Sequence, residues 1–119
     1  MAATETPARA PFAQAAALVD TDGSLLQAKG IKAVTRPTTG IYCITFKDDR
    51  LTPDKLIVQA TLIAAGDSTN PTSGTPRGST ILVRTHPFAD CGNDPAAITV
   101  ATMNEANDLF DLPFFVTVA

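Results

Sequence analysis

The chain has 119 residues, of which 45% are apolar and 18% are charged, and its formal net charge at neutral pH is −3. This length fits one domain, and the apolar share excludes a chain that is disordered throughout. The acidic balance excludes the basic surface that nucleic acids require, and no apolar run reaches the length of a membrane span. We therefore expect one domain whose partners include no nucleic acid and no membrane.

The N-terminal stretch contains Pro7 and Pro11 among small residues. It lacks the charged start and the long apolar run of a secretion signal. We expect a flexible arm over residues 1–13 and a single domain over residues 14–119. The alternative is an arm that docks on a neighbouring subunit. The missing signal indicates either a protein made without export, as a virion component is, or a leader that has been removed.

From residue 14 onward, short apolar stretches alternate with turn residues at intervals of about ten residues, which is typical of an all-β fold. The strands that this pattern predicts are 14–19, 24–28, 31–36, 41–47, 56–64, 80–85, 97–102 and 114–118. Residues 11–19 and 104–110 have some helical character, but both stretches are too short to form independent helices. We therefore predict an antiparallel sandwich or jelly roll of about eight strands.

Individual residues in this pattern have predicted folding roles. Tyr42 and Phe46 share one face of the strand 41–47, so we expect both to anchor the core. Arg36 has acidic residues in the nearby turns as candidate partners for an ion pair at the rim. Asp111, which precedes Leu112 and Pro113, is expected to hold the turn before the last strand.

Residues 66–79 are rich in Gly, Ser, Thr and Pro and contain no large apolar side chain. Such a segment cannot join the core, so it is predicted to be a long surface loop. One interpretation is a tolerated insertion without function. The other is a contact loop, with Asp67, Asn70 and Arg77 as its candidate contact residues.

The residues that could carry chemistry form no recognisable site. His86 is the only histidine, and no Gly-X-Ser-X-Gly motif provides a nucleophile. The stretch 20–24 lacks the spacing of a calcium loop and favours a β-turn. The acidic cluster over 104–111 favours a solvated rim over a cation site. We therefore predict no enzyme, no catalytic residue, no cofactor and no metal, and a His86→Ala variant that keeps its function.

Cys43 and Cys91 are the only cysteines and lie 48 positions apart. An even count in a small, loop-rich β chain favours a disulfide between them. The alternative is a pair of reduced thiols, with Cys43 acting as a small buried apolar residue.

Several stretches together resemble a known kind of β domain: ALVDTDGSL (17–25), GIKAVTR (30–36), TGIYCITF (39–46), ITVAT (98–102) and DLPFFVTV (111–118). This small domain recurs in actinobacterial extracellular proteins and in phage or phage-like structural proteins. A subset of its members carries a Cys after the Tyr and another before the penultimate strand, as Cys43 and Cys91 do here. The resemblance implies a β module with no catalytic residues to carry over.

Two functions remain as expectations. The first is a non-enzymatic structural or adhesive module on the virion surface of a phage or phage-like particle: a capsid decoration, tail fibre or tail-tip protein. It would be a homo-oligomer, a trimer by analogy with fibre-associated modules, with other virion or surface proteins as partners. The alternative is a secreted, extracellular domain that binds a carbohydrate or a protein. A single Tyr and no Trp count against stacking on sugars.

Overall fold

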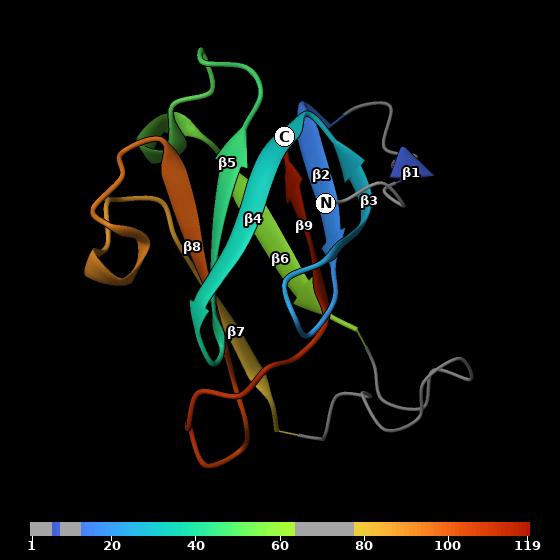
Figure 1. Cartoon of the computed structure of the whole chain (residues 1–119), viewed down its shortest axis with the longest axis vertical. Helices are drawn as coiled ribbons and strands as arrows, with labels where there is room; N and C mark the ends of the chain where they lie inside the picture. Colours follow the sequence, from blue (N-terminus) through green and yellow to red (C-terminus); the bar gives the residue numbers. More distant parts are fainter. Residues whose placement is uncertain (1–5, 8–12, 64–77) are drawn as a thin grey trace.

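The computed structural model describes residues 6–7, 13–63 and 78–119. Eight antiparallel strands form two sheets of four strands each, packed as a sandwich (Figure 1). The antiparallel strands of the first sheet have the order β3-β2-β9-β6, and the second sheet has the order β4-β5-β8-β7. The strands are β2 (Ala15–Val19), β3 (Leu25–Lys29), β4 (Ile31–Thr38), β5 (Ile41–Phe46), β6 (Val58–Leu62), β7 (Thr80–Arg84), β8 (Ala97–Met103) and β9 (Phe114–Val118). The predicted all-β sandwich is confirmed.

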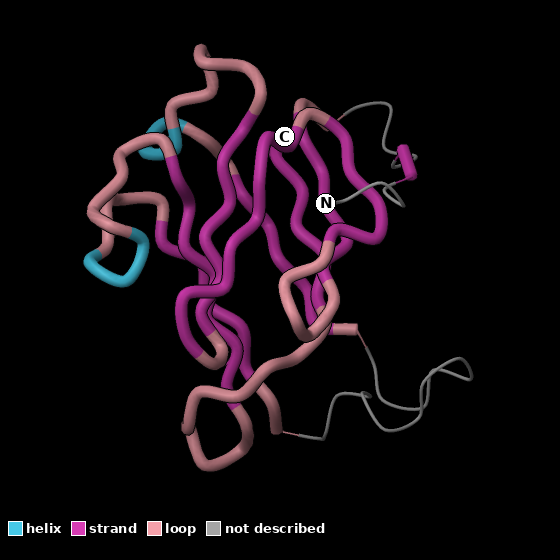
Figure 2. The backbone as a smooth tube through the Cα atoms, viewed as in Figure 1, coloured by secondary structure: helices cyan, strands magenta, loops and turns pink. Residues whose placement is uncertain are grey.

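The two stretches with helical character do not form helices within the described residues. Ala15–Val19 is the strand β2, because burial between two neighbouring strands overrides the helix propensity of alanine. Residues 104–110 are a loop closed by a bridge between Met103 and Leu109. Two short 3-10 turns, η1 (Pro53–Lys55) and η3 (Ala89–Cys91), lie in loops between strands (Figure 2).

The predicted and observed strand limits differ most at β6, since the limits of the other strands differ by two residues at most. Residues 56–64 are an apolar run, but β6 begins only at Val58. The backbone N–H of Leu56 donates to the carbonyl of Pro53 at 3.1 Å and closes the turn η1, so Leu56 is not available to the sheet. Ala64 lies outside the described residues.

A short strand that the sequence analysis did not predict extends the first sheet. Residues Thr6–Pro7 of the expected arm form β1, which pairs with β3 in parallel, Thr6 beside Gln27 and Pro7 beside Ala28 (Figure 1). It covers two residues of an edge strand that otherwise presents unpaired backbone groups.

The core lies between the two sheets and follows the alternation of the strands. Tyr42, Ile44 and Phe46 of β5 all point into it and are at most 5% exposed. The ring of Tyr42 meets that of Phe114 edge to face, with centroids 4.9 Å apart and an interplanar angle of 67°. The predicted core roles of Tyr42 and Phe46 are therefore confirmed. Among the described residues, no helix has the length and apolar character needed to cross a membrane.

Candidate functional site

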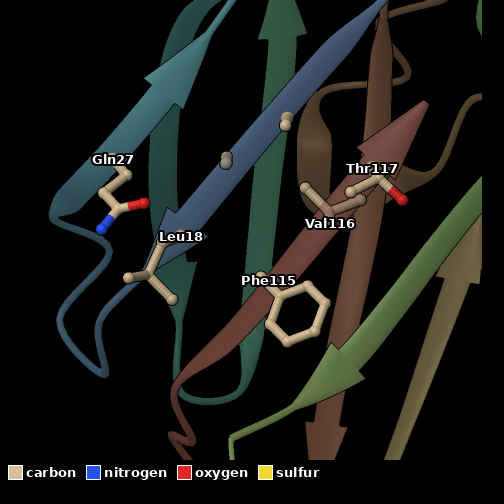
Figure 3. A pocket seen from close by; sticks show the side chains of 7 residues that line it. Leu18, Gln27, Phe115, Val116 and Thr117 are labelled. Atoms are coloured by element: carbon tan, nitrogen blue, oxygen red, sulfur yellow. The ribbon is translucent and has the colours of Figure 1, made fainter. Parts of the chain in front are cut away.

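A strip of uncharged side chains runs over the outer face of the first sheet. Leu18 of β2 lies between Phe115 of β9 and Gln27 of β3 in the strand register, and Figure 3 shows these side chains on neighbouring strands. Because side chains alternate along a strand, Phe114 is fully buried while the next residue, Phe115, is 42% exposed. We call the following residues the outer strip: Ala16, Leu18, Gln27, Phe115 and Thr117.

The outer strip contains a shallow hollow. It has a volume of about 190 Å³ and is bordered by the strip residues together with Ala17 and Val116 (Figure 3). Ala16 is the smallest side chain of the strip and has Thr117 as its register partner on β9. The exposed ring of Phe115 forms part of the border of the hollow.

This face carries little charge. Taken by register across the four strands, the outward positions are Ala16, Leu18, Gln27, Lys29, Gln59, Thr61, Phe115 and Thr117. Lys29 is the only ionisable residue among these described positions, and it lies at the β3 edge. Ile57, which directly precedes β6, adds an apolar side chain that is 72% exposed. A surface of this composition can be buried against another protein without desolvating several ions.

Asp111 holds one end of the sandwich together. Its Oδ2 accepts a hydrogen bond from Arg36 Nη1 at 2.6 Å, and its Oδ1 accepts one from the backbone N–H of Gly40 at 2.6 Å. The Tyr42 hydroxyl lies 3.4 Å from the same Oδ1 and donates to the nearer carbonyl of Thr21 at 2.8 Å. The expected rim pair of Arg36 is formed, and the expected role of Asp111 before the last strand is confirmed.

Burial raises the pKa of the Tyr42 phenol well above its ordinary value, and the nearby negative charge of Asp111 raises it further. The phenol is therefore a neutral hydrogen-bond donor throughout the physiological range. The buried phenol has a role in folding, because its hydroxyl joins the β2–β3 turn to the loop before β9.

The turn over residues 20–24 is a β-turn, as expected, and its carboxylates bind its own backbone. Asp20 Oδ1 accepts from the N–H of Thr21 at 2.8 Å, and Asp22 Oδ1 accepts from the N–H of Ser24 at 2.9 Å. The hydrogen bonds with Ser24 lower the pKa of the Asp22 carboxyl. In the acidic cluster, Asn104 Oδ1 likewise accepts from backbone N–H groups of its own loop. No group of three metal-ligating side chains occurs within the described part of the chain.

The predicted disulfide between Cys43 and Cys91 is present, with the two Cα atoms 5.7 Å apart. Cys43 lies on the outer face of β5, and the bond holds the turn η3 against that face. Thr99 Oγ1 of β8 lies 3.1 Å from the Cys91 sulfur. Beside the bond is an open groove of about 330 Å³ with polar residues at its border, among them Thr35, Thr45, Asp90 and Asp94.

Four further candidates remain, namely His86 and the three candidate contact residues of the long loop. His86 is exposed in the loop that follows β7, and near it the Arg84 guanidinium stacks over the Phe88 ring at 4.5 Å. Asp67, Asn70 and Arg77, the candidate contact residues of the long loop, lie outside the described residues.

Comparison of the chain with family models, with curated proteins and with solved structures finds no match. The resemblance to the recurrent β domain therefore stays a prediction. The fold and the surface of this chain carry the functional argument.

The sequence analysis missed the outer strip. Alternation in β9 indicates that Phe114 and Phe115 point to opposite faces, which was a usable signal. The pairing of Phe115 with Leu18 joins residues at opposite ends of the sequence, and periodicity gives no information about which strands are neighbours. The sequence of β9 indicates an exposed aromatic residue. The strip can be identified only when the order of the strands in the sheet is known.

Proposed function

We propose that this chain is a non-enzymatic structural or adhesive module of a phage or phage-like particle, where it acts through surface contacts on the virion surface. The observation that carries the proposal is the outer strip, in which the exposed ring of Phe115 and the partly exposed Leu18 lie on a sheet face with one ionisable residue. Exposed apolar surface of this kind marks sites of protein contact. We infer the class of particle from the motif resemblance, and the mode of action from the exposed surface.

The construction of the domain supports a role of this kind. The disulfide holds the turn η3 to the second sheet, and the ion pair of Asp111 joins that sheet to the loop before β9. Both suit a module that keeps its shape outside a cell. The proposed partners are identical copies of the chain, in a trimer by analogy, and other virion or surface proteins.

Fractionation of particles tests the proposal. Particles from cells that produce the chain would be purified on a density gradient and probed with an antibody against it. We expect the chain to sediment with the particle band and to be labelled on intact particles, with His86→Ala behaving as the unaltered chain. Recovery of the chain only as free protein in the culture medium would refute the proposal.

A second candidate, a secreted binding domain for a carbohydrate or a protein, is favoured by the groove beside the disulfide. Asp90, Asp94, Thr35 and Thr45 border this groove. Carboxylates and hydroxyls are groups that can hydrogen-bond sugar hydroxyls. Binding of the secreted chain to a glycan array, lost in an Asp90→Ala/Asp94→Ala variant, would favour this candidate over the particle module.

A further inference from the structure

We propose that copies of this chain associate through the outer strip, so that the outer face of the first sheet is the subunit interface. This inference rests on the proposed function, because it names a surface through which copies of the chain contact one another. A face that pairs with itself joins two copies, so the outer strip gives a two-fold contact within the assembly. The occupant of the strip is a second copy of the chain. The charge and the shape of the face favour it over another partner, and the area of the face sets the strength of the contact.

The first observation is the charge of the face. A second copy would present the same nearly neutral outward positions, with Lys29 of each copy at the β3 edge rather than at the centre. Two identical surfaces repel each other when charges lie at their centre, and here the central strands β2 and β9 present Ala16, Leu18, Phe115 and Thr117. Cores of protein interfaces are depleted in charge and enriched in aromatic residues in the same way.

The second observation is the shape of the strip, in which a protruding ring lies next to a hollow. Phe115 is 42% exposed, and the hollow of about 190 Å³ lies on the same face (Figure 3). The phenyl ring of one copy can enter the hollow of its neighbour, and buried aromatic anchors in pockets supply much of the binding energy of an interface. A surface that carries both parts of such a contact is complementary to itself.

The area of the face determines how strong one contact is. Beside the strip, Ile57 before β6 adds an apolar side chain that is 72% exposed. With strands about 4.8 Å apart and a rise of about 3.3 Å per residue, the face itself measures roughly 19 by 17 Å. This is smaller than the roughly 800 Å² that each partner buries in a standard interface, so one contact is weak. Many copies held on one particle make such a contact effective.

The matched test compares Phe115→Glu with Leu82→Glu. Leu82 is 55% exposed on β7 of the other sheet, so both variants place one negative charge at an exposed apolar position. Sedimentation of the unaltered chain over rising concentration should show self-association. Phe115→Glu should weaken that association by at least about tenfold, and Leu82→Glu should leave it unchanged. Circular dichroism and thermal melts of each variant verify that it is folded.

A cross-linking measurement captures a weak contact. Thr117→Cys places a free thiol in the strip, and Leu82→Cys places one on the opposite surface. On mild oxidation, we expect linked dimers from Thr117→Cys in excess of those from Leu82→Cys. Equal cross-linking from the two variants, a chain that stays monomeric at every concentration, or association that survives Phe115→Glu would each overturn the inference. The particle fractionation described above is independent of these outcomes, so it judges the proposed function separately.

Discussion

Arg36 and Asp111 lie 75 residues apart in the sequence, and their side chains are joined by a hydrogen bond of 2.6 Å. Arg36 belongs to β4 of the second sheet, and Asp111 lies in the loop that leads into β9 of the first sheet. The same carboxylate accepts a second hydrogen bond from the backbone of Gly40. One side chain therefore fixes the β4–β5 hairpin to the entry of a central strand.

We expect Asp111→Ala to lower the free energy of unfolding by about 1–3 kcal/mol, because the Gly40 N–H loses its acceptor. Asp111→Asn keeps an oxygen acceptor and should cost less, and Arg36→Ala should cost about 0–1 kcal/mol because the pair is partly exposed. Urea denaturation of the three variants measures their free energies of unfolding and so the order of the three losses. An equal loss in all three would show that the ion pair, and not the bond to Gly40, carries the effect.

A second prediction concerns Gly40, whose backbone has a φ of +76°. A Cβ there would lie 2.8 Å from both Phe110 N and Thr102 O, which are backbone atoms that cannot move aside cheaply. Gly92 has a similar φ of +69°, but a Cβ there meets nothing within 4 Å. Both alanine variants impose left-handed strain, and only Gly40→Ala adds a clash. The melting temperature should therefore fall clearly further in Gly40→Ala than in Gly92→Ala, and equal falls would contradict the clash.

The sequence predicted the strands well, because most of them alternate in polarity and are bounded by turn residues. The strand 114–118 was predicted with its observed limits, since Pro113 marks its start and Phe114 and Val116 alternate with polar or exposed positions. The pairing of Cys43 with Cys91 was also predictable, because the chain offers no other pair.

What could not be predicted depends on strand order. Arg36 had several possible acidic partners, and the contacts of Asp111 with Arg36 and Gly40 follow from the return of the chain from β8 to β9 across the end of the sandwich. The short strand β1 pairs over two residues only, and Pro7 within it argues against a strand. The local sequence does not indicate β1, because this strand forms only through its pairing with the edge of β3.

The buried phenol of Tyr42 predicts a loss of stability in alkali. Its pKa in the folded chain is raised, whereas in the unfolded chain it is about 10. Above that pH the folded chain keeps a proton that the unfolded chain has lost, so the stabilisation is complete below pH 10 and declines as the pH rises further. The free energy of unfolding should fall more steeply above about pH 10 in the unaltered chain than in Tyr42→Phe.

Tyr42 is the only tyrosine and the chain has no tryptophan, so the phenolate absorbance reports on this one group. We expect the phenolate signal to appear together with the loss of the far-ultraviolet circular dichroism of the fold. A phenolate that forms near pH 10 while the chain stays folded would contradict the buried, hydrogen-bonded phenol.

The last prediction concerns the disulfide. Cys43 and Cys91 close a loop across 48 positions, and in the chain-entropy model such a bond stabilises a fold by about 4 kcal/mol. Reduction removes this constraint from the unfolded chain and frees the turn η3 from the face of β5, while the core between the sheets keeps its packing. The urea midpoint should therefore fall strongly when a reductant is added. The Cys43→Ala/Cys91→Ala variant should match the reduced chain and show no response to reductant. A midpoint that is the same with and without reductant in the unaltered chain would show that the bond does not constrain the unfolded state.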